Sequence, residues 1–143
     1  MYDLKLTRMS LPDGDIVYLI GASLCIFNSN NSFIIQNIIK KTNDINKWYL
    51  LMNKTSGEIK KEICEYIADD DISVSFSKLV EKRNRIIHSF GGTANNGRQV
   101  LFTVDKKTNR QFEITEEYLK EFIHKNEELS DKLYKYRNAL DKE

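Results

Sequence analysis

An arginine and a histidine that are suited to chemistry lie five residues apart in the stretch "SKLVEKRNRIIHSFGG", residues 77–92. His88 can take up or release a proton at physiological pH, because the unperturbed pKa of an imidazole is near neutral. The planar fork of Arg83 can bind two phosphate oxygens. Asn84, one helical turn before His88, can orient the imidazole or the phosphate by a hydrogen bond. Arg83, Asn84 and His88 are therefore the candidate catalytic residues.

Arg83 occupies the centre of an apolar stripe in its predicted helix. Large apolar side chains fall within about 60° of it on an ideal helix: Phe76, Leu79, Val80, Ile86, Ile87 and Phe90. A guanidinium stays charged, so burial without a partner is costly. Arg83 could pair with a buried carboxylate, extend along the apolar surface to water, or face a cleft or a second subunit. His88 lies about 140° away on the same helix, toward the polar side, where a helix C-terminus favours histidine.

The string "RNRIIH", residues 83–88, matches the pattern R-N-x-x-x-H. In this motif the chain resembles the HEPN superfamily of ribonucleases. The resemblance implies a small helical domain that forms a homodimer or pseudo-dimer, with the motif helices meeting across a cleft. It also implies a metal-independent endoribonuclease in which Arg83, Asn84 and His88 are catalytic. The 2′-hydroxyl of the RNA would attack, and the products would carry 2′,3′-cyclic phosphate.

Known members of this superfamily include toxins of toxin–antitoxin pairs, abortive-infection proteins and CRISPR effector nucleases. The resemblance therefore implies three partners: an RNA substrate, a second copy of the chain, and an antitoxin or another protein of a defence system. In toxins paired with a nucleotidyltransferase antitoxin, the motif usually continues as histidine-x-tyrosine, and that tyrosine can be modified. Here the corresponding residue is Phe90, which has no hydroxyl to modify.

Basic residues near the motif are candidates for positioning RNA. They are Arg85 within the motif, Lys82 just before it, and Arg98, Lys106, Lys107 and Arg110 in a predicted hairpin. The alternative for the hairpin charges is a solvated turn. The formal net charge of the chain is +1, so an RNA site would have to be a local basic patch. "GGTANNG", residues 91–97, is expected to be a mobile loop at the mouth of the site.

The periodicity of the remaining sequence predicts a single domain, residues 1–143, that is mainly α-helical. The fold class is a helical bundle of HEPN type with an inserted β-hairpin before a long C-terminal helix. Helices are expected over 15–28 and 32–41, either as one kinked helix or as two helices interrupted at "NSNN" (28–31). Further helices are expected over 45–54, from 55 to 68, and from Ser73 or Ser75 to Gly91–Gly92. Residues 1–10 are expected to be a loose arm or a short strand.

From residue 98 the period of the apolar pattern changes to two, which predicts strands over 98–104 and 110–114 with a loop at 105–109. Thr115 then opens the final helix. Its apolar positions form a seam with Asn126 at one place, and this seam would pack along one partner helix within the chain or across a dimer.

The composition is that of a soluble globular protein, with 41% apolar and 30% charged residues. The apolar run from Ile16 to Phe27 is shorter than the roughly 18–20 residues that span a bilayer, so we expect a buried helix in a cytoplasmic protein without membrane contact. Cys25 and Cys64 are expected to be buried free thiols in a reducing compartment. Two cysteines and two histidines form no cluster with metal-ligand spacing, so no metal or other cofactor is expected.

Two alternatives to a nuclease stay open. The chain could be a catalytically inactive HEPN-like dimer that binds nucleic acid, a nucleotide or a protein partner. It could also be an unrelated helical interaction domain in which the motif arises by chance. An Arg83 that is salt-bridged within its own protomer, away from any cleft, would favour the unrelated domain.

Overall fold

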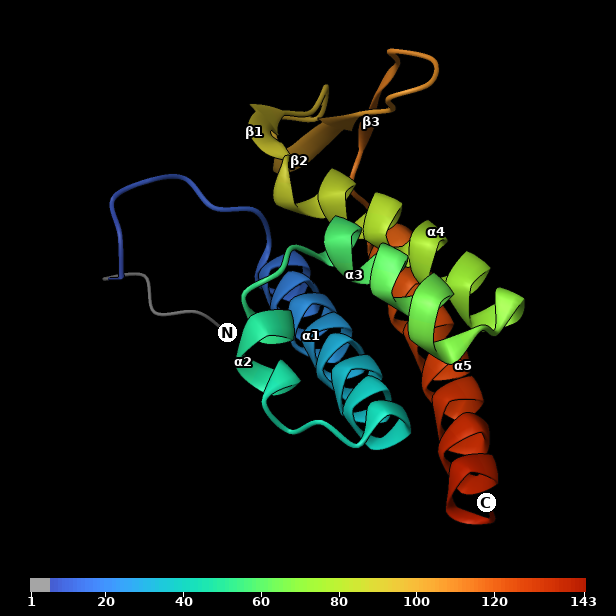
Figure 1. Ribbon diagram of the computed structural model, residues 1–143. Coiled ribbons are helices and arrows are strands. Elements are labelled where there is room, and N and C mark those ends of the chain that lie inside the picture. Colours follow the sequence, from blue (N-terminus) through green and yellow to red (C-terminus); the bar gives the residue numbers. More distant parts are fainter. Residues whose placement is uncertain (1–5) are drawn as a thin grey trace.

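The computed structural model describes residues 6–143 and contains helices with one small sheet (Figure 1). The elements are α1 (Gly14–Thr42), α2 (Lys47–Met52), α3 (Ser56–Glu62), the π-helical turn η1 (Ile63–Ile67), α4 (Asp70–Ile87), β1 (Phe90–Thr93), β2 (Gln99–Val104), β3 (Gln111–Glu113) and α5 (Glu116–Asp141). The prediction of a mainly helical fold with strands before a long C-terminal helix is confirmed. Of the predicted N-terminal arm, residues 1–5 lie outside the described residues, and residues 6–10 contain no helix or strand.

Helix α1 settles whether the N-terminal apolar region forms one helix or two. It runs unbroken for 29 residues, and the Asn- and Ser-rich stretch continues it. Asn30 explains part of this continuity, because its side-chain amide donates to the backbone oxygen of Asn126 (2.8 Å) and to its Oδ1 (3.1 Å) on α5. The seam of α5 therefore packs against α1 within the chain, and its polar position is satisfied by a partner across that contact.

The core lies where α1, α4 and α5 meet. The fully buried ring of Phe27 stacks on Phe76 of α4, with ring centroids 5.7 Å apart, and on Phe122 of α5 at 6.2 Å. Burial of each such ring contributes roughly 1.5–3 kcal/mol. This aromatic stack fixes the side of α4 that faces inward, and therefore the direction in which Arg83 leaves the helix.

The predicted ends of α4 were wrong at both termini. The helix begins at Asp70 rather than at Ser73 or Ser75, because the Asp69 side chain caps it by accepting from the Ile72 N–H at 3.1 Å. Asp70 and Asp71 form the first turn, where the helix dipole favours negative charge. At the other end the helix stops at Ile87 and not at the glycine pair.

Both glycines of that pair lie in strand β1, the part of the sheet that the sequence did not predict. The expected loop at residues 91–97 is therefore wrong for its first three residues. The strands form an antiparallel sheet in the order β1-β2-β3, with Phe90 paired to Phe102. The predicted hairpin of β2 and β3 is confirmed. β1 was missed because glycines leave it without an alternating apolar pattern. The sheet lies beyond the C-terminal end of α4 (Figure 1).

The prediction that both cysteines are buried was wrong, since Cys25 and Cys64 are exposed. Helix α1 has one exposed ridge, which carries Cys25 together with Tyr18 and Asn28, although Ile16 and Phe27 of the same apolar run are buried. The sequence does not mark this ridge, because apolar and small residues occupy it. No helix among residues 6–143 is both long and apolar enough to cross a membrane.

Candidate functional site

Arg83 has no acidic partner among the residues that the structure describes. Its guanidinium carbon lies 5.4 Å from the centre of the Phe27 ring, a cation–π contact. Nη1 donates to Oδ1 of the neighbouring Asn84 over a long 3.4 Å, and the buried Nε has no hydrogen-bond partner. The arginine is only half-buried. A buried ion pair therefore does not explain the charge in the apolar stripe.

The Arg83 side chain instead lines a surface depression of about 390 Å³ where α1, α4 and the start of α3 meet. We call it the Arg83 pocket. Its lining residues are Asn28, Asn31, Ser32, Met52, Lys54, Thr55, Ser56 and Arg83. Amides, hydroxyls and two cations dominate this lining, and no carboxylate of residues 6–143 contributes to it. Lys54 is paired with Glu62 at 3.2 Å, so Arg83 is the cation of this pocket without a carboxylate partner.

The apolar stripe around Arg83 is mostly core and not an exposed face. Phe76, Leu79, Val80 and Ile86 are buried within the protomer. Only the end of the stripe is open, since Ile87 is 43% and Phe90 is 45% exposed. The part of this stripe that is open to a second subunit is thus confined to the C-terminal end of α4.

His88 lies at that end, as the C-cap residue of α4. Its backbone N–H donates to the Asn84 carbonyl at 3.0 Å, while its side chain is exposed. Within residues 6–143 the imidazole forms no hydrogen bond, and His88 is not among the residues that line the Arg83 pocket. The side chains of Arg83 and Asn84 are therefore in contact, whereas no hydrogen bond or ion pair joins the His88 imidazole to either of them among the described residues.

Lys82, just before the motif, and Arg85, within it, face the sheet and α5. Arg85 donates a hydrogen bond to the Val104 carbonyl at the end of β2. Lys82 pairs with Glu121 at 3.3 Å and lies 5.9 Å from the ring centre of Tyr118. Burial raises the pKa of Tyr118 to about 12, an effect that the nearby Arg85 charge partly opposes. Both cations thus hold α4 against its neighbours.

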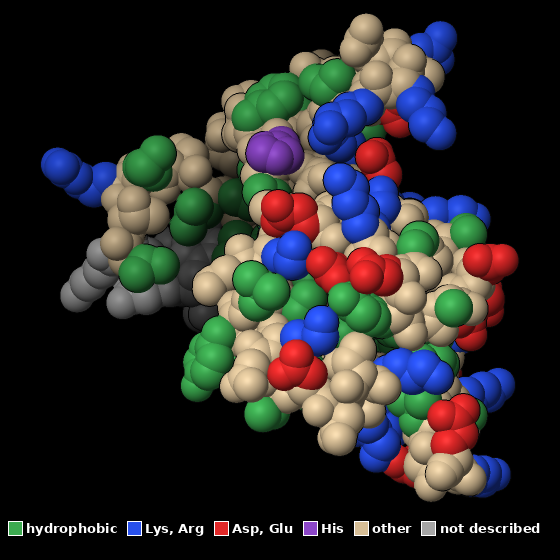
Figure 2. All heavy atoms as spheres, in the orientation of Figure 1, with side chains coloured by type: hydrophobic (Ala, Val, Ile, Leu, Met, Phe, Trp, Pro, Cys, Tyr) green, Lys and Arg blue, Asp and Glu red, His purple; other side chains and the backbone are tan. Residues whose placement is uncertain are grey.

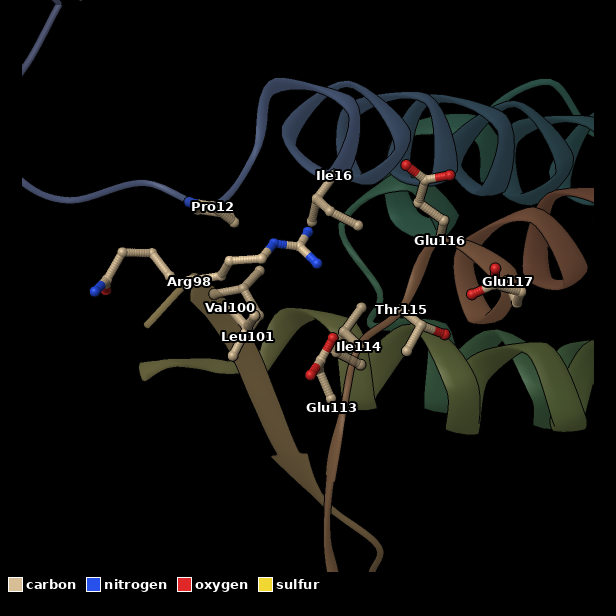
Figure 3. A pocket seen from close by; sticks show the side chains of 11 residues that line it. Pro12, Ile16, Arg98, Val100, Leu101, Glu113, Ile114, Thr115, Glu116 and Glu117 are labelled. Carbon is tan, nitrogen blue, oxygen red and sulfur yellow. The ribbon is translucent and has the colours of Figure 1, made fainter. Parts of the chain in front are cut away.

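Arg98 lies at the other end of β2, apart from the motif. It forms an ion pair with Asp13, which raises the pKa of the guanidinium. Its side chain extends into a pocket of about 230 Å³ between the start of α1, the sheet and the start of α5 (Figure 3). Three glutamates also line this pocket: Glu113, Glu116 and Glu117. The surrounding negative charge opposes phosphate binding at Arg98.

The remaining predicted cations, Lys106, Lys107 and Arg110, are exposed around the loop between β2 and β3. Asp105 shapes this loop by accepting from the backbone N–H groups of Lys107 and Thr108, both at 2.9 Å. These hydrogen bonds lower the pKa of Asp105. Figure 2 shows Lys and Arg side chains at this outer end of the sheet, in the upper right of the view, and others over the neighbouring part of α4.

The sequence reasoning missed the residues that surround Arg83. Asn28 and Ser32 come from α1, and Thr55 and Ser56 come from the start of α3. The stretch of Asn and Ser residues inside an otherwise apolar helix could have pointed to this site. In the sequence it indicated an interruption of the helix instead. Among the described residues, no group of three or more His, Cys, Asp or Glu side chains could hold a metal ion.

Comparison with known proteins adds no relative: no protein-family model, no curated protein and no solved structure matches this chain. The resemblance therefore depends on the motif at residues 83–88, and the functional argument depends on the geometry around it.

Proposed function

We propose that this chain is a metal-independent endoribonuclease of HEPN type that acts as a homodimer. The observation that carries the proposal is the state of Arg83. A half-buried guanidinium without a carboxylate partner, opening onto a polar pocket, is suited to binding a phosphate. A structural arginine at the centre of an apolar stripe would be expected to have a buried acidic partner.

The proposed reaction is a transesterification within the RNA. The 2′-oxygen forms a bond to the phosphorus and loses its proton, the bond from phosphorus to the 5′-oxygen breaks, and the 5′-oxygen gains a proton. His88 transfers a proton in this sequence, a role that typically contributes about 10²–10⁴-fold to a rate. Arg83 stabilises the charge on the phosphorane oxygens, and Asn84 positions the guanidinium that it contacts.

A second copy of the chain would complete the site. The Arg83 side chain lines a depression between α1 and α3. The exposed His88 lies at the end of α4, beside the exposed Ile87 and Phe90. Exposed apolar side chains next to a proton-transfer residue favour a contact between copies at this end of the helix. In such a dimer, His88 of one protomer can act on RNA bound by Arg83 of the other.

The hairpin cations are the surface best placed to attract RNA, because they are exposed and close to the end of α4. A role as a toxin or in phage defence follows from the resemblance to HEPN proteins. Any antitoxin would have to act without modifying the position of Phe90, which lacks a hydroxyl.

The second candidate is a HEPN-like dimer that binds RNA or another ligand without cutting it. One observation favours it: the His88 imidazole has no orienting hydrogen bond among the described residues. A general base or acid is normally held in place by a partner. In the nuclease, the second copy or the substrate must supply that partner.

The experiment that separates these functions compares wild type with His88→Ala on total RNA in EDTA, with the product ends mapped. His124→Ala is the matched control, because His124 is an exposed histidine on α5 near Glu127 and Glu128. The nuclease predicts cyclic-phosphate ends from wild type and His124→Ala, and none from His88→Ala. Equal cleavage by all three proteins would refute it. A stable dimer that binds RNA but never cuts it would support the second candidate.

A further inference from the structure

The middle of α1 carries five consecutive Asn or Ser residues, Asn28–Ser32, in the longest helix of the described chain. Such residues are each less favourable than alanine inside a helix, by up to about 0.7 kcal/mol. Asn30 donates hydrogen bonds to Asn126 of α5, and Asn31 accepts a long hydrogen bond of 3.5 Å from the Ser56 hydroxyl, whereas Asn28, Ser29 and Ser32 form no side-chain hydrogen bond among the described residues. Asn28 and Ser29 are exposed, and Asn31 and Ser32 are half-buried. Binding of a ligand would explain this concentration of polar groups at the surface.

Two cavities meet along this stretch. The Arg83 pocket lies on one side of α1. On the other side, between α1 and α5, lies an open groove of about 800 Å³, which we call the Tyr134 groove. Its lining residues are Cys25, Asn28, Ser29, Asn30, Ser32, Phe33, Gln36, Ser130, Tyr134 and Arg137. Asn28 and Ser32, one helical turn apart, line both cavities. A bound chain molecule could therefore cross α1 from one cavity to the other.

The Tyr134 groove contains a fixed aromatic ring that is open to solvent. Tyr134 is 59% exposed, and its ring centre lies 4.7 Å from that of Phe33 at an interplanar angle of 45°. Phe33 in turn contacts Arg137, whose guanidinium carbon lies 5.1 Å from the centre of the Phe33 ring. The Arg137 Nε in turn donates to Oδ1 of the buried Asn37 at 2.5 Å. The ring is thus supported by neighbours that are themselves anchored.

The charge around these cavities suits a polyanion. Neither cavity has an Asp or Glu among its lining residues, and each contains an arginine. The Arg98 pocket is the opposite case, since three glutamates line it. An exposed aromatic ring beside amide and hydroxyl groups can stack on a nucleobase and hydrogen-bond to its edges.

We propose that the Tyr134 groove binds a base of single-stranded RNA whose neighbouring phosphate lies at Arg83, with the strand crossing α1 over Asn28 and Ser32. This inference deepens the proposed nuclease and rests on it for the phosphate at Arg83. It assigns the groove a ligand class, an unpaired nucleobase. It also explains why α1 keeps a polar stretch at its centre.

The test uses the His88→Ala protein, so that RNA stays intact, and measures binding of a labelled single-stranded RNA oligonucleotide by fluorescence anisotropy. Adding Tyr134→Ala should weaken binding by roughly 5- to 100-fold, the usual range when one base-stacking ring is removed. Tyr134→Phe should bind like the parent. Tyr49→Ala is the matched control, because this tyrosine is 78% exposed on α2 and lies outside both cavities. It should also leave binding unchanged.

Two further measurements test whether a base occupies the groove and whether the RNA strand crosses α1. An oligonucleotide of the same length with abasic residues should bind weakly, and equally to the parent and to Tyr134→Ala. Asn28→Asp, which places a negative charge on the exposed ridge between the cavities, should weaken binding of the intact oligonucleotide several-fold. Equal affinities for Tyr134→Ala and Tyr49→Ala would overturn the proposal. So would a change of oligomeric state in Tyr134→Ala, since the groove would then be covered by a second copy.

Failure of this inference can be distinguished from failure of the proposed function. If wild type cleaves RNA in EDTA but Tyr134→Ala binds and cleaves like wild type, the nuclease stands and the groove is not its base site. If binding depends on Tyr134 but wild type never cleaves, the groove binds RNA and the nuclease is refuted.

Discussion

Replacing Arg83 by methionine separates a role in binding phosphate from a role in holding the fold together. Beside its long hydrogen bond to Asn84, two features of the side chain determine its effect on stability: the contact with the Phe27 ring and the buried Nε without a partner among the described residues. Removing the cation–π interaction costs about 0.5–2 kcal/mol. Removal of a buried donor that has no acceptor recovers about 1–3 kcal/mol. A methionine thioether keeps part of the packing on the ring.

The two terms oppose each other, so Arg83→Met should lie between about 1 kcal/mol less stable and about 2.5 kcal/mol more stable than wild type. For a chain of 143 residues, 1 kcal/mol corresponds to about 3 °C in Tm. We therefore expect a Tm between about 3 °C below and about 7.5 °C above that of wild type. Cleavage should nevertheless fall about 10²–10³-fold, as when a donor to a developing oxyanion is removed.

The assay combines thermal and urea unfolding with RNA cleavage in EDTA. Arg85→Met is the control, because its guanidinium donates to the Val104 carbonyl. It should lose roughly 1–3 kcal/mol, the cost of leaving a half-buried carbonyl unpaired, and recover a similar amount because the Arg85 Nε is also buried without a partner among the described residues. Its stability should therefore stay within about 2 kcal/mol of wild type. A destabilisation of about 3 kcal/mol or more in Arg83→Met, the size seen when a buried ion pair is broken, would refute the reasoning and make Arg83 structural.

Four other changes have expected outcomes. Gly92→Ala should cost roughly 1–3 kcal/mol in thermal unfolding, because the added Cβ would lie 2.6 Å from two ring carbons of Phe102. Gly91→Ala, with no atom within 4 Å of its Cβ, should stay near wild type. The pKa of Asp105 is lower in the folded protein than its ordinary value of 3.8, so the ionised carboxylate stabilises the fold above that pH. This stabilisation is lost as the pH falls through the pKa of the folded state. The Tm of Asp105→Asn should therefore fall less than that of wild type between pH 7 and pH 3. Replacing Lys106, Lys107 and Arg110 of the hairpin loop by glutamine should leave Tm unchanged. The slope of log Kd for RNA against log salt concentration should become smaller by about 0.7 for each phosphate that the protein no longer neutralises. Ile87→Glu should shift sedimentation from dimer to monomer at a fixed concentration; unchanged sedimentation would exclude this end of α4 from the interface.

Features that depend on local periodicity could be predicted from the sequence. The long C-terminal helix, its Thr115 cap and the hairpin all follow from spacing and cap residues. The position of Arg83 in an apolar stripe is equally local, since the angle between residues of one helix is fixed.

Features that depend on contacts between distant segments could not be predicted. The stripe around Arg83 gives no sign that Phe27 of α1 lies under the guanidinium, or that Ser32 and Ser56 border it. Strand β1 forms because β2 offers it a partner, although its own glycines carry no strand pattern. The exposure of Cys25 follows from which face of α1 packs on α5, a choice made by the whole bundle.

The separation of Arg83 from His88 determines how the two can act together. Helix α4 keeps them on different sides, and α1 and α3 enclose only Arg83. A symmetric contact at the exposed end of α4 would place the same surface of two copies against each other, so His88 would enter the interface with Ile87. In that arrangement Ile87→Glu reduces association and cleavage together, whereas Arg83→Met reduces cleavage and leaves the dimer intact. Weakened association in both variants would place Arg83 in the interface rather than in a phosphate site.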